Sequence, residues 1–219
     1  MISIVIPVYN ELTRIDAFQA RLEALAGEKE ILFSDGFSTD GSYEKIRLPK
    51  IQKAKGRGAQ LKAAAEEVHG EYLWFLHADS IPHPDSPEAI ASSGADWGCF
   101  RLAFLSNRPM MKVVAFQSDQ RVRFRRIVFG DQGMFIKRSL YTAIGGFRPI
   151  PLMEDYDISM RLKAAGHKPH LLSQKIHTDA RMFERNGIWP TIFLMQKLQR
   201  AFRRGASAKE LNRIYRRQS

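Results

Sequence analysis

Strand-like and helix-like hydrophobic patterns alternate along the first half of the chain. Residues 2–8 are apolar on both faces and rich in β-branched side chains, which is typical of a buried parallel strand. Over residues 13–25 the apolar positions recur every three or four residues, and this spacing predicts a helix. Strands are expected at residues 30–34 and 72–76, with a helix over residues 55–68 between them. Such alternation predicts an α/β domain with a largely parallel sheet, whose ligands bind at the carboxyl ends of the strands.

The pattern is less regular in the second half of the chain. Short strands are expected at residues 98–105 and 133–137. Near the C-terminus the apolar residues return to helical spacing. We therefore expect one domain over residues 1–185 and a helical extension over residues 186–219. The apolar positions of the expected helix are Ile188, Ile192, Met195, Leu198 and Phe202.

The composition supports a packed domain and narrows the class of protein. Of the 219 residues 44% are hydrophobic, so global disorder is excluded. The single cysteine, Cys99, excludes an intramolecular disulfide framework and a cysteine-rich zinc module, and it suits the reducing cytoplasm. The N-terminus has neither a leading basic residue nor a cleavage site, so we expect a strand there rather than a signal peptide.

The net charge of +11 indicates anionic partners such as phosphates, nucleotides or anionic lipids. The last 24 residues alone carry +7, and the apolar run at residues 188–195 is too short to span a membrane. Two hypotheses stay open for this basic extension. It lies on an anionic membrane surface, which would place the protein at the inner face of the membrane, or it packs on the domain with a solvated basic face.

Polar residues that suit phosphate and metal chemistry follow the predicted strands. Asp35 and Asp79 each come shortly after a strand, Arg57 lies between two glycines, and Glu154 and Asp155 form an acidic pair. Hard divalent cations prefer carboxylate oxygens and take their remaining ligands from substrate phosphates and water. A nucleoside diphosphate is therefore the expected ligand, although aspartates in such turns also serve as turn formers or helix N-caps.

Six short segments with distinctive polar, glycine and acidic residues follow one another along the chain. They are IVIPVYNE (4–11), SDGFSTDGS (34–42), LHADS (76–80), GDQG (130–133), GGF (145–147) and MEDYD (153–157). Together, over about residues 2–185, these segments resemble in order the motifs of family 2 glycosyltransferases of the GT-A fold. The resemblance implies an α/β domain with a single mixed, mostly parallel sheet flanked by helices. It points to a small bacterial branch whose metal motif begins with histidine.

The resemblance implies where the donor nucleotide binds. The loop after the first strand resembles the family's cradle for base and ribose, and Arg57 resembles a contact to base or phosphate. Strand termination and packing are the alternative roles of Pro7 and Tyr9. The expected donor is a UDP- or GDP-linked sugar. The implied nucleotide-sugar-binding residues are Pro7, Tyr9, Asn10, Glu11, Asp35, Arg57 and Asp79.

The tripeptide His77-Ala78-Asp79 stands where the family has its Asp-x-Asp metal motif. The resemblance implies that Asp79 binds Mn²⁺ or Mg²⁺ between the donor phosphates. Histidine departs from the common pattern: either His77 is a ligand, which favours Mn²⁺, or it hydrogen-bonds a neighbour at the strand end. A further ligand is expected in the loop at residues 176–181, from His177 as first choice or from Asp179.

Glu154 and Asp155 resemble the acidic pair that supplies the general base of the family. An inverting transfer needs one group to take the proton of the acceptor hydroxyl as it attacks C1, and we choose Asp155 first and Glu154 second. Carboxylates at this place would also complement the N-terminus of a following helix, and both roles are compatible. Asp131 and Gln132 stand where the family positions acceptor or donor-sugar hydroxyls, unless they only form a turn after Gly130.

Together these observations predict a metal-dependent inverting glycosyltransferase that moves a sugar from a nucleotide-diphosphate sugar to a hydroxyl acceptor. The basic amphipathic extension favours a lipid-linked or membrane-proximal acceptor, and nucleic acid is not an expected partner. The competing hypothesis is a non-catalytic protein that retains the fold and binds nucleotides or an anionic surface. The altered metal motif and the basic extension motivate this second hypothesis.

Overall fold

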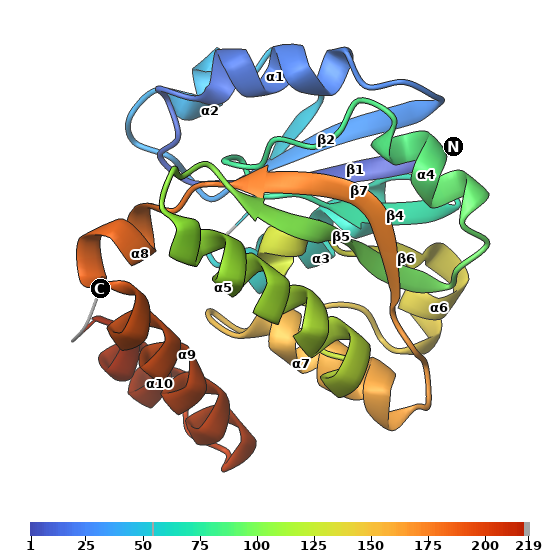
Figure 1. The fold of residues 1–219 in the computed structure, drawn as a ribbon. Coiled ribbons are helices and arrows are strands. Elements are labelled where there is room, and N and C mark those ends of the chain that lie inside the picture. The colour runs from blue at the N-terminus through green and yellow to red at the C-terminus, as the bar shows by residue number, and fades with distance from the viewer. Residues whose placement is uncertain (54, 217–219) are drawn as a thin grey trace.

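The molecule is built on one sheet of seven strands, which are β1 (Ile2–Val8), β2 (Lys29–Asp35), β3 (Lys50–Gln52), β4 (Tyr72–Phe75), β5 (Trp97–Phe104), β6 (Phe135–Lys137) and β7 (His170–Thr178). The computed structural model describes residues 1–53 and 55–216. The strands lie in the order β3-β2-β1-β4-β6-β5-β7 (Figure 1). β6 is antiparallel to β4 and β5, and the other pairings in this sheet are parallel. The predicted mixed, mostly parallel sheet is confirmed.

Helices cover both faces of the sheet (Figure 1). One face carries α1 (Ile15–Glu23) and α4 (Ser86–Ser92), and the other carries α3 (Arg57–Glu67), α6 (Arg138–Ala143) and α7 (Glu154–Ala164). Because both faces are covered, the central strands are buried on both sides, as their apolar runs predict. The remaining elements are α2 (Ser42–Lys45), α5 (Pro109–Gln120), the π-helical turn η1 (Arg121–Arg125), the 3₁₀ turn η2 (Gly130–Gln132), α8 (Arg181–Asn186), α9 (Ile188–Arg203) and α10 (Ala208–Arg216).

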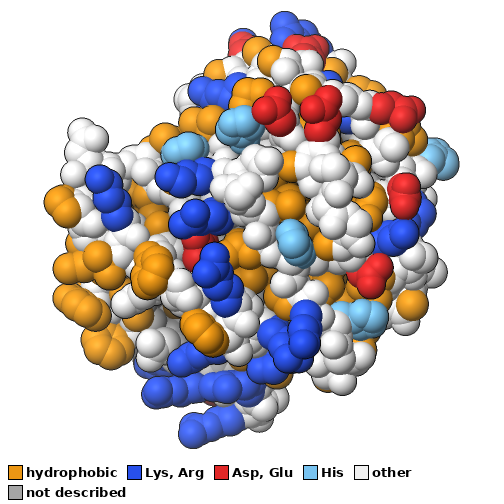
Figure 2. All heavy atoms as spheres, turned by 45° about the vertical axis from the view of Figure 1, so that its right-hand side comes forward, with side chains coloured by type: hydrophobic (Ala, Val, Ile, Leu, Met, Phe, Trp, Pro, Cys, Tyr) orange, Lys and Arg blue, Asp and Glu red, His pale blue; other side chains and the backbone are white. Residues whose placement is uncertain are grey.

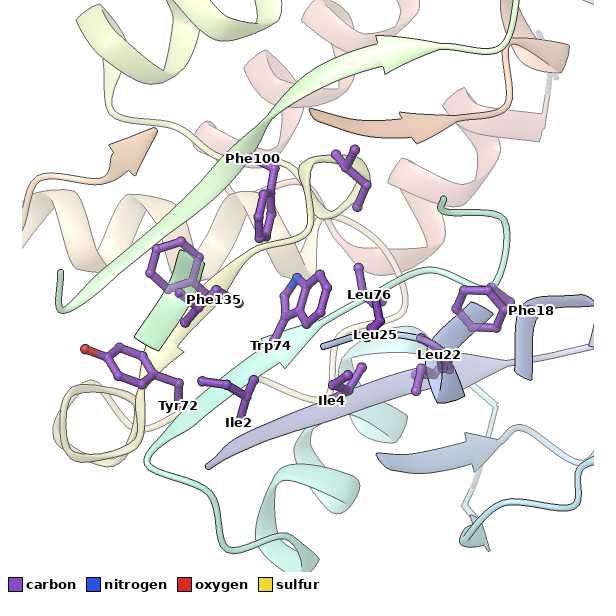
Figure 3. Packing of buried hydrophobic residues seen from close by; sticks show 14 of the residues in the cluster. Ile2, Ile4, Phe18, Leu22, Leu25, Tyr72, Trp74, Leu76, Phe100 and Phe135 are labelled. Carbon is purple, nitrogen blue, oxygen red and sulfur yellow. The ribbon is translucent and has the colours of Figure 1, made fainter. Parts of the chain in front are cut away.

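Side chains of β1 alternate between two hydrophobic cores. Ile2 and Ile4 pack on the α1 side with Trp74 of β4, as Figure 3 shows, whereas Val5 packs with the helices of the opposite face. The rings of Trp74 and Phe100 lie 5.4 Å apart between centroids and join β4 to β5 across the same core. Since a fully buried large aliphatic side chain contributes about 1.5–3 kcal/mol, this packing holds β1 in the middle of the sheet.

The structure contains β3, β7 and α5, which the hydrophobic pattern does not predict. The segment at residues 176–181, expected as a loop, begins as the last part of β7. The pairing of β5 with β7 shifts register between Phe100 and Arg101, so buried and exposed positions along β7 do not alternate regularly. The period of two that marks a strand is therefore absent from its sequence.

The C-terminal extension packs on the domain. Leu194 and Leu198 of α9 and Leu211 of α10 are buried in a cluster with Met153 and Tyr156. This arrangement corresponds to the packing hypothesis for these apolar positions. Within the described part of the chain, no helix combines the length and the apolar character needed to cross a membrane.

Candidate active site

The loops after β1 and β2 hold each other at the carboxyl edge of the sheet. Asp35 is fully buried and accepts a hydrogen bond from the backbone N–H of Ser38 at 2.9 Å. Asn10 adopts a left-handed φ of 57°, donates its backbone N–H to Ser38 Oγ and accepts the N–H of Thr39 at Oδ1, both at 2.9 Å. Asp35 and Asn10 therefore shape the cradle, and the side chain of Asp35 does not reach its surface.

A cavity of about 200 Å³ opens where β1 and β4 end. Its lining includes Pro7 near the end of β1 and Tyr9 and Glu11 from the following loop, together with Arg57, His77 and Asp79. Burial and the nearby Asp79 carboxylate raise the pKa of Glu11, so the two acids lie close in a desolvated place. The structure thus brings together six of the predicted residues that the sequence separates by up to 72 positions.

A larger cavity of about 320 Å³ continues from this cradle, and we call it the central pocket. Arg57, His77 and Asp79 line it from one side, and Asp131 and Asp155 from the other. Four strand or helix ends thus deliver carboxylates and one guanidinium to a single space. This is the chemistry that a diphosphate with a bound divalent cation requires.

Arg57 connects the two halves of the central pocket. Its Nε lies 3.0 Å from Oε1 of Glu154, whose side chain is 1% exposed, and its Nη1 donates to Nε2 of His77 at 3.4 Å. Burial raises the pKa of Glu154, against the opposing effect of Arg57. Burial and the Arg57 charge lower the pKa of His77, so its imidazole is neutral at physiological pH. His77 thus hydrogen-bonds a neighbouring side chain, and its role as a metal ligand stays a prediction.

Asp155 is held at the N-terminus of α7. Its Oδ2 accepts the backbone N–H of Gly130 at 2.8 Å, and its Oδ1 accepts that of Tyr156 at 2.7 Å. Met153, directly before the helix, has a left-handed φ of 70°, a strained conformation that turns the chain into the pocket. At Gly130 a Cβ atom would lie 2.6 Å from Nε2 of His77, so this close approach requires glycine.

The two residues of the Asp131-Gln132 pair have different environments. Gln132 is fully buried, where its Oε1 accepts from Arg121 at 2.6 Å and its Nε2 donates to the Phe100 carbonyl at 3.4 Å. The position of Gln132 does not suit its expected role in binding sugar hydroxyls, because both the oxygen and the nitrogen of its amide are hydrogen-bonded inside the protein. Asp131 lines the central pocket, and its buried Oδ1 has no hydrogen-bond partner among the residues that the structure describes.

Replacing Asp131 by asparagine is expected to stabilise the protein more at pH 8 than at pH 5. Burial raises the pKa of Asp131 from 3.8 to about 6, and the nearby Arg121 opposes this shift. Because the folded state binds the proton more tightly than the unfolded state, stability falls as the pH rises from about 4 to about 6. Asparagine does not titrate, so the gain should be up to about 3 kcal/mol at pH 8 and about half of that at pH 5.

Urea unfolding at the two pH values measures this difference. Asp16→Asn is the matched control, because Asp16 forms an exposed pair with Lys45 and its loss should change stability by less than about 0.5 kcal/mol at either pH. An Asp131→Asn variant that is less stable than the wild type at pH 8 would contradict the expectation.

The donor set at Asp79 fits a divalent cation that is shared with a substrate. Burial raises the pKa of Asp79, which indicates a carboxylate whose charge lacks full compensation by the protein. Among the described residues no three His, Cys, Asp or Glu side chains form a cluster able to hold a metal. Asp79 suits the type of Mg²⁺ or Mn²⁺ site in which one or two carboxylates are completed by phosphates and water.

The predicted ligand His177 lies in β7 rather than in a loop, and its backbone pairs with Ile81. The central pocket is lined instead by the next two residues, Thr178 and Asp179. Asp179 is bound by Arg14 at 2.9 Å and by Arg181 at 2.7 Å. The structure therefore places Asp179, the second choice, near Asp79, with its charge already balanced by two arginines.

Two residues near the pocket are absent from the sequence-based set. Tyr215 of α10 lines the central pocket, so the extension contributes to its wall. Lys55 lies with its Nζ 3.5 Å from the centroid of the Tyr9 ring, beside the cradle. In the sequence, only the helical spacing of Leu211 and Tyr215 indicates that Tyr215 faces the domain. No motif marks Lys55.

A family model matches the N-terminal part of the chain. Residues 3–93 match the model of glycosyl transferase family 2. The matched part holds the cradle, Arg57 and Asp79. No curated protein matches the sequence significantly.

Several solved structures have a similar fold. S. aureus TarS matches with a TM-score of 0.65 at 15% identity, over 81% of this chain and 36% of that one. TarS in complex with UDP-GlcNAc gives 0.66 at 17% identity, over 81% and 58%. The mannosyltransferase PcManGT from Pyrobaculum calidifontis, in complex with GDP-Man and Mn²⁺, gives 0.65 at 17% identity, over 91% and 60%. The chain thus has the GT-A fold and spans between about a third and three fifths of these proteins.

Proposed function

We propose that this protein transfers a sugar from a nucleoside-diphosphate sugar to a hydroxyl acceptor, with inversion at C1 and with Mn²⁺ or Mg²⁺ as cofactor. The observation that carries this proposal is the convergence of Asp79, Arg57, Asp131 and Asp155 on one pocket at the carboxyl edge of the sheet. The match of residues 3–93 to the model of glycosyl transferase family 2 supports the reaction class. Complexes of similar folds with UDP-GlcNAc and with GDP-Man and Mn²⁺ support the donor class and the metal.

The donor would lie with its nucleoside in the cradle after β1 and its diphosphate toward Asp79. When bound at Asp79, the cation supplies Lewis-acid stabilisation of the departing diphosphate. Arg57 is 44% exposed despite its pair with Glu154, so part of its guanidinium is free to contact a phosphate. The neutral His77 maintains the orientation of Arg57 without adding a positive charge.

Asp155 would accept the proton of the acceptor hydroxyl. It lies on the pocket wall, and its oxygens are oriented by two backbone N–H groups, which suits a general base that must keep one geometry. Glu154 is less suited, because its Oε1 is paired with Arg57 and its side chain is buried. Asp131 would position a sugar hydroxyl through its unpartnered oxygen. We also propose that residues 186–219 complete the site, since Tyr215 lines the pocket.

A panel of UDP-, GDP- and dTDP-sugars tests the proposal. Thermal shift and donor hydrolysis are measured with Mn²⁺, with Mg²⁺ and with EDTA. We expect one nucleotide to raise the melting temperature only when the metal is present, because a ligand that binds the folded state stabilises it by mass action. We also expect slow metal-dependent hydrolysis of its sugar. Binding without any turnover, with or without acceptor, would favour a non-catalytic nucleotide-binding protein.

A further inference from the structure

A second cavity of about 500 Å³ lies between α5 with η1 on one side and α8 with α9 on the other, and we call it the α5–α9 groove. Its walls are mostly apolar, with Val114, Phe124, Phe183, Ile192 and Met195 among them. The size lies in the usual range for a small-molecule site. Its apolar character contrasts with the charged central pocket, so the two cavities suit different parts of a ligand.

The α5–α9 groove and the central pocket share walls. Phe104, Phe129, Asp131 and Met182 line both cavities. At this junction the buried Oδ1 of Asp131 has no hydrogen-bond partner within the described part of the chain, so a polar group that reaches the inner end of the groove would satisfy it. A molecule in the groove therefore has an apolar path that ends at the carboxylates.

Large apolar side chains are also exposed on the elements that form the groove. Phe124, which lines the groove, is 81% exposed, and Phe116 of α5 and Phe193 of α9 are 58% and 64% exposed. On the face drawn in Figure 2, hydrophobic side chains gather at one margin beside Lys and Arg side chains. Exposed apolar groups next to cations are typical of a surface that meets an amphiphile with an anionic head group.

We propose that the α5–α9 groove binds the hydrocarbon chain of an amphiphilic acceptor and leads its hydroxyl head to Asp131 and Asp155. This inference rests on the proposed function and names its acceptor class. A water-soluble sugar or alcohol would gain nothing from an apolar channel of this size, whereas a chain would bury its methylene groups there. Arg125, which lines the groove, offers a positive charge for a phosphate on the same molecule.

Alkyl β-glucosides, which carry a hydrocarbon chain on a sugar head group, are suitable probes of the groove. Their binding can be measured without any sugar transfer. Titration calorimetry of the full chain compares methyl, hexyl, octyl and decyl glucoside below their micellar concentrations. We expect no binding of the methyl compound, and an affinity that rises by about threefold for each added methylene. An affinity that does not rise with chain length would overturn the inference.

Two variants locate the binding site. Ile192→Trp fills the groove and should weaken decyl glucoside binding by at least about tenfold, and Phe124→Gln, at an exposed position, should weaken it by at least about threefold. Phe193→Gln and Phe116→Gln are the matched controls, because these side chains are also mostly exposed but are not among the residues that line the groove. If the controls weaken binding as much as the groove variants, the chain adsorbs to the surface and the inference is wrong.

Two further measurements separate this inference from the proposed function. Metal-dependent nucleotide binding, measured on the same variants, should be unchanged. If the nucleotide binds and decyl glucoside does not, the acceptor class is wrong while the sugar-transfer proposal stands; the reverse result rejects the donor site and leaves chain binding in place. The groove could instead bind a second copy of this chain, and sedimentation velocity detects such a dimer. If the wild type is a dimer and Phe124→Gln dissociates it, the groove is a dimer interface and the inference is wrong.

Discussion

An Asp79→Asn variant should lose metal-dependent binding of nucleoside diphosphate and keep its fold. Asp79 lines both the cradle and the central pocket, so its carboxylate lies where a cation between protein and phosphates would be held. Loss of a partner outside the coordination sphere already costs about 10–100-fold in metal affinity, and loss of a direct carboxylate ligand should cost at least about 100-fold. Calorimetric titration of UDP and GDP, with Mn²⁺ and with EDTA, measures the change.

The stability of the same variant separates a ligand from a structural residue. Burial raises the pKa of Asp79, so its ionised form is disfavoured in the folded protein and asparagine should leave the melting temperature at pH 7.5 equal or higher. Asp96→Asn is the control, because Asp96 is exposed before β5, at the opposite edge of the sheet. Unchanged Mn²⁺-dependent nucleotide affinity in Asp79→Asn would reject Asp79 as the metal ligand.

The sequence predicts the first half of the fold well because the physical signals there are local. β1 and β4 are buried on both faces and therefore appear as short apolar runs. The polar residues that follow them come to the same edge because parallel strands end there together. The cradle, Arg57 and Asp79 could thus be placed from spacing and resemblance without knowledge of any contact.

Other features depend on contacts between distant segments, which spacing does not encode. β7 is a strand because it pairs with β5, across a shift in register that removes its alternation. Gln132 is buried because Arg121 and the Phe100 carbonyl bind its amide, although its neighbour Asp131 faces the pocket. Tyr215 reaches the central pocket only because α9 and α10 fold back on the domain.

The structure also shows how the positive charges near the central pocket are arranged. Around the central pocket the arginines are paired with carboxylates: Arg57 with Glu154, and Arg14 and Arg181 with Asp179. The pocket is therefore a balanced network rather than a plain basic patch. A diphosphate carrying a divalent cation disturbs this balance less than a free anion would, which favours a metal–nucleotide complex as ligand.

The general base is expected to be identified by comparing Asp155 and Asp131, which line the central pocket, with the buried Glu154 beside them. Asp155→Asn should lower the rate of sugar transfer by at least about 100-fold, because asparagine cannot take the acceptor proton, and should leave donor affinity within about threefold. Asparagine retains one oxygen for the N–H of Gly130 or Tyr156, so the geometry at the start of α7 should persist. Single-turnover transfer and nucleotide titration measure the two quantities separately.

Glu154→Gln and Asp131→Asn provide the comparison, and Asp157→Asn provides the control. Asp157 lies two residues after Asp155 on α7 but pairs with Arg148 and Arg161, so its loss should lower stability and not the rate at a temperature where the variant is folded. Glu154→Gln should mainly alter donor affinity, because it weakens the pair that orients Arg57. If Glu154→Gln or Asp131→Asn loses as much rate as Asp155→Asn, with donor affinity intact, the proton is taken by that residue instead.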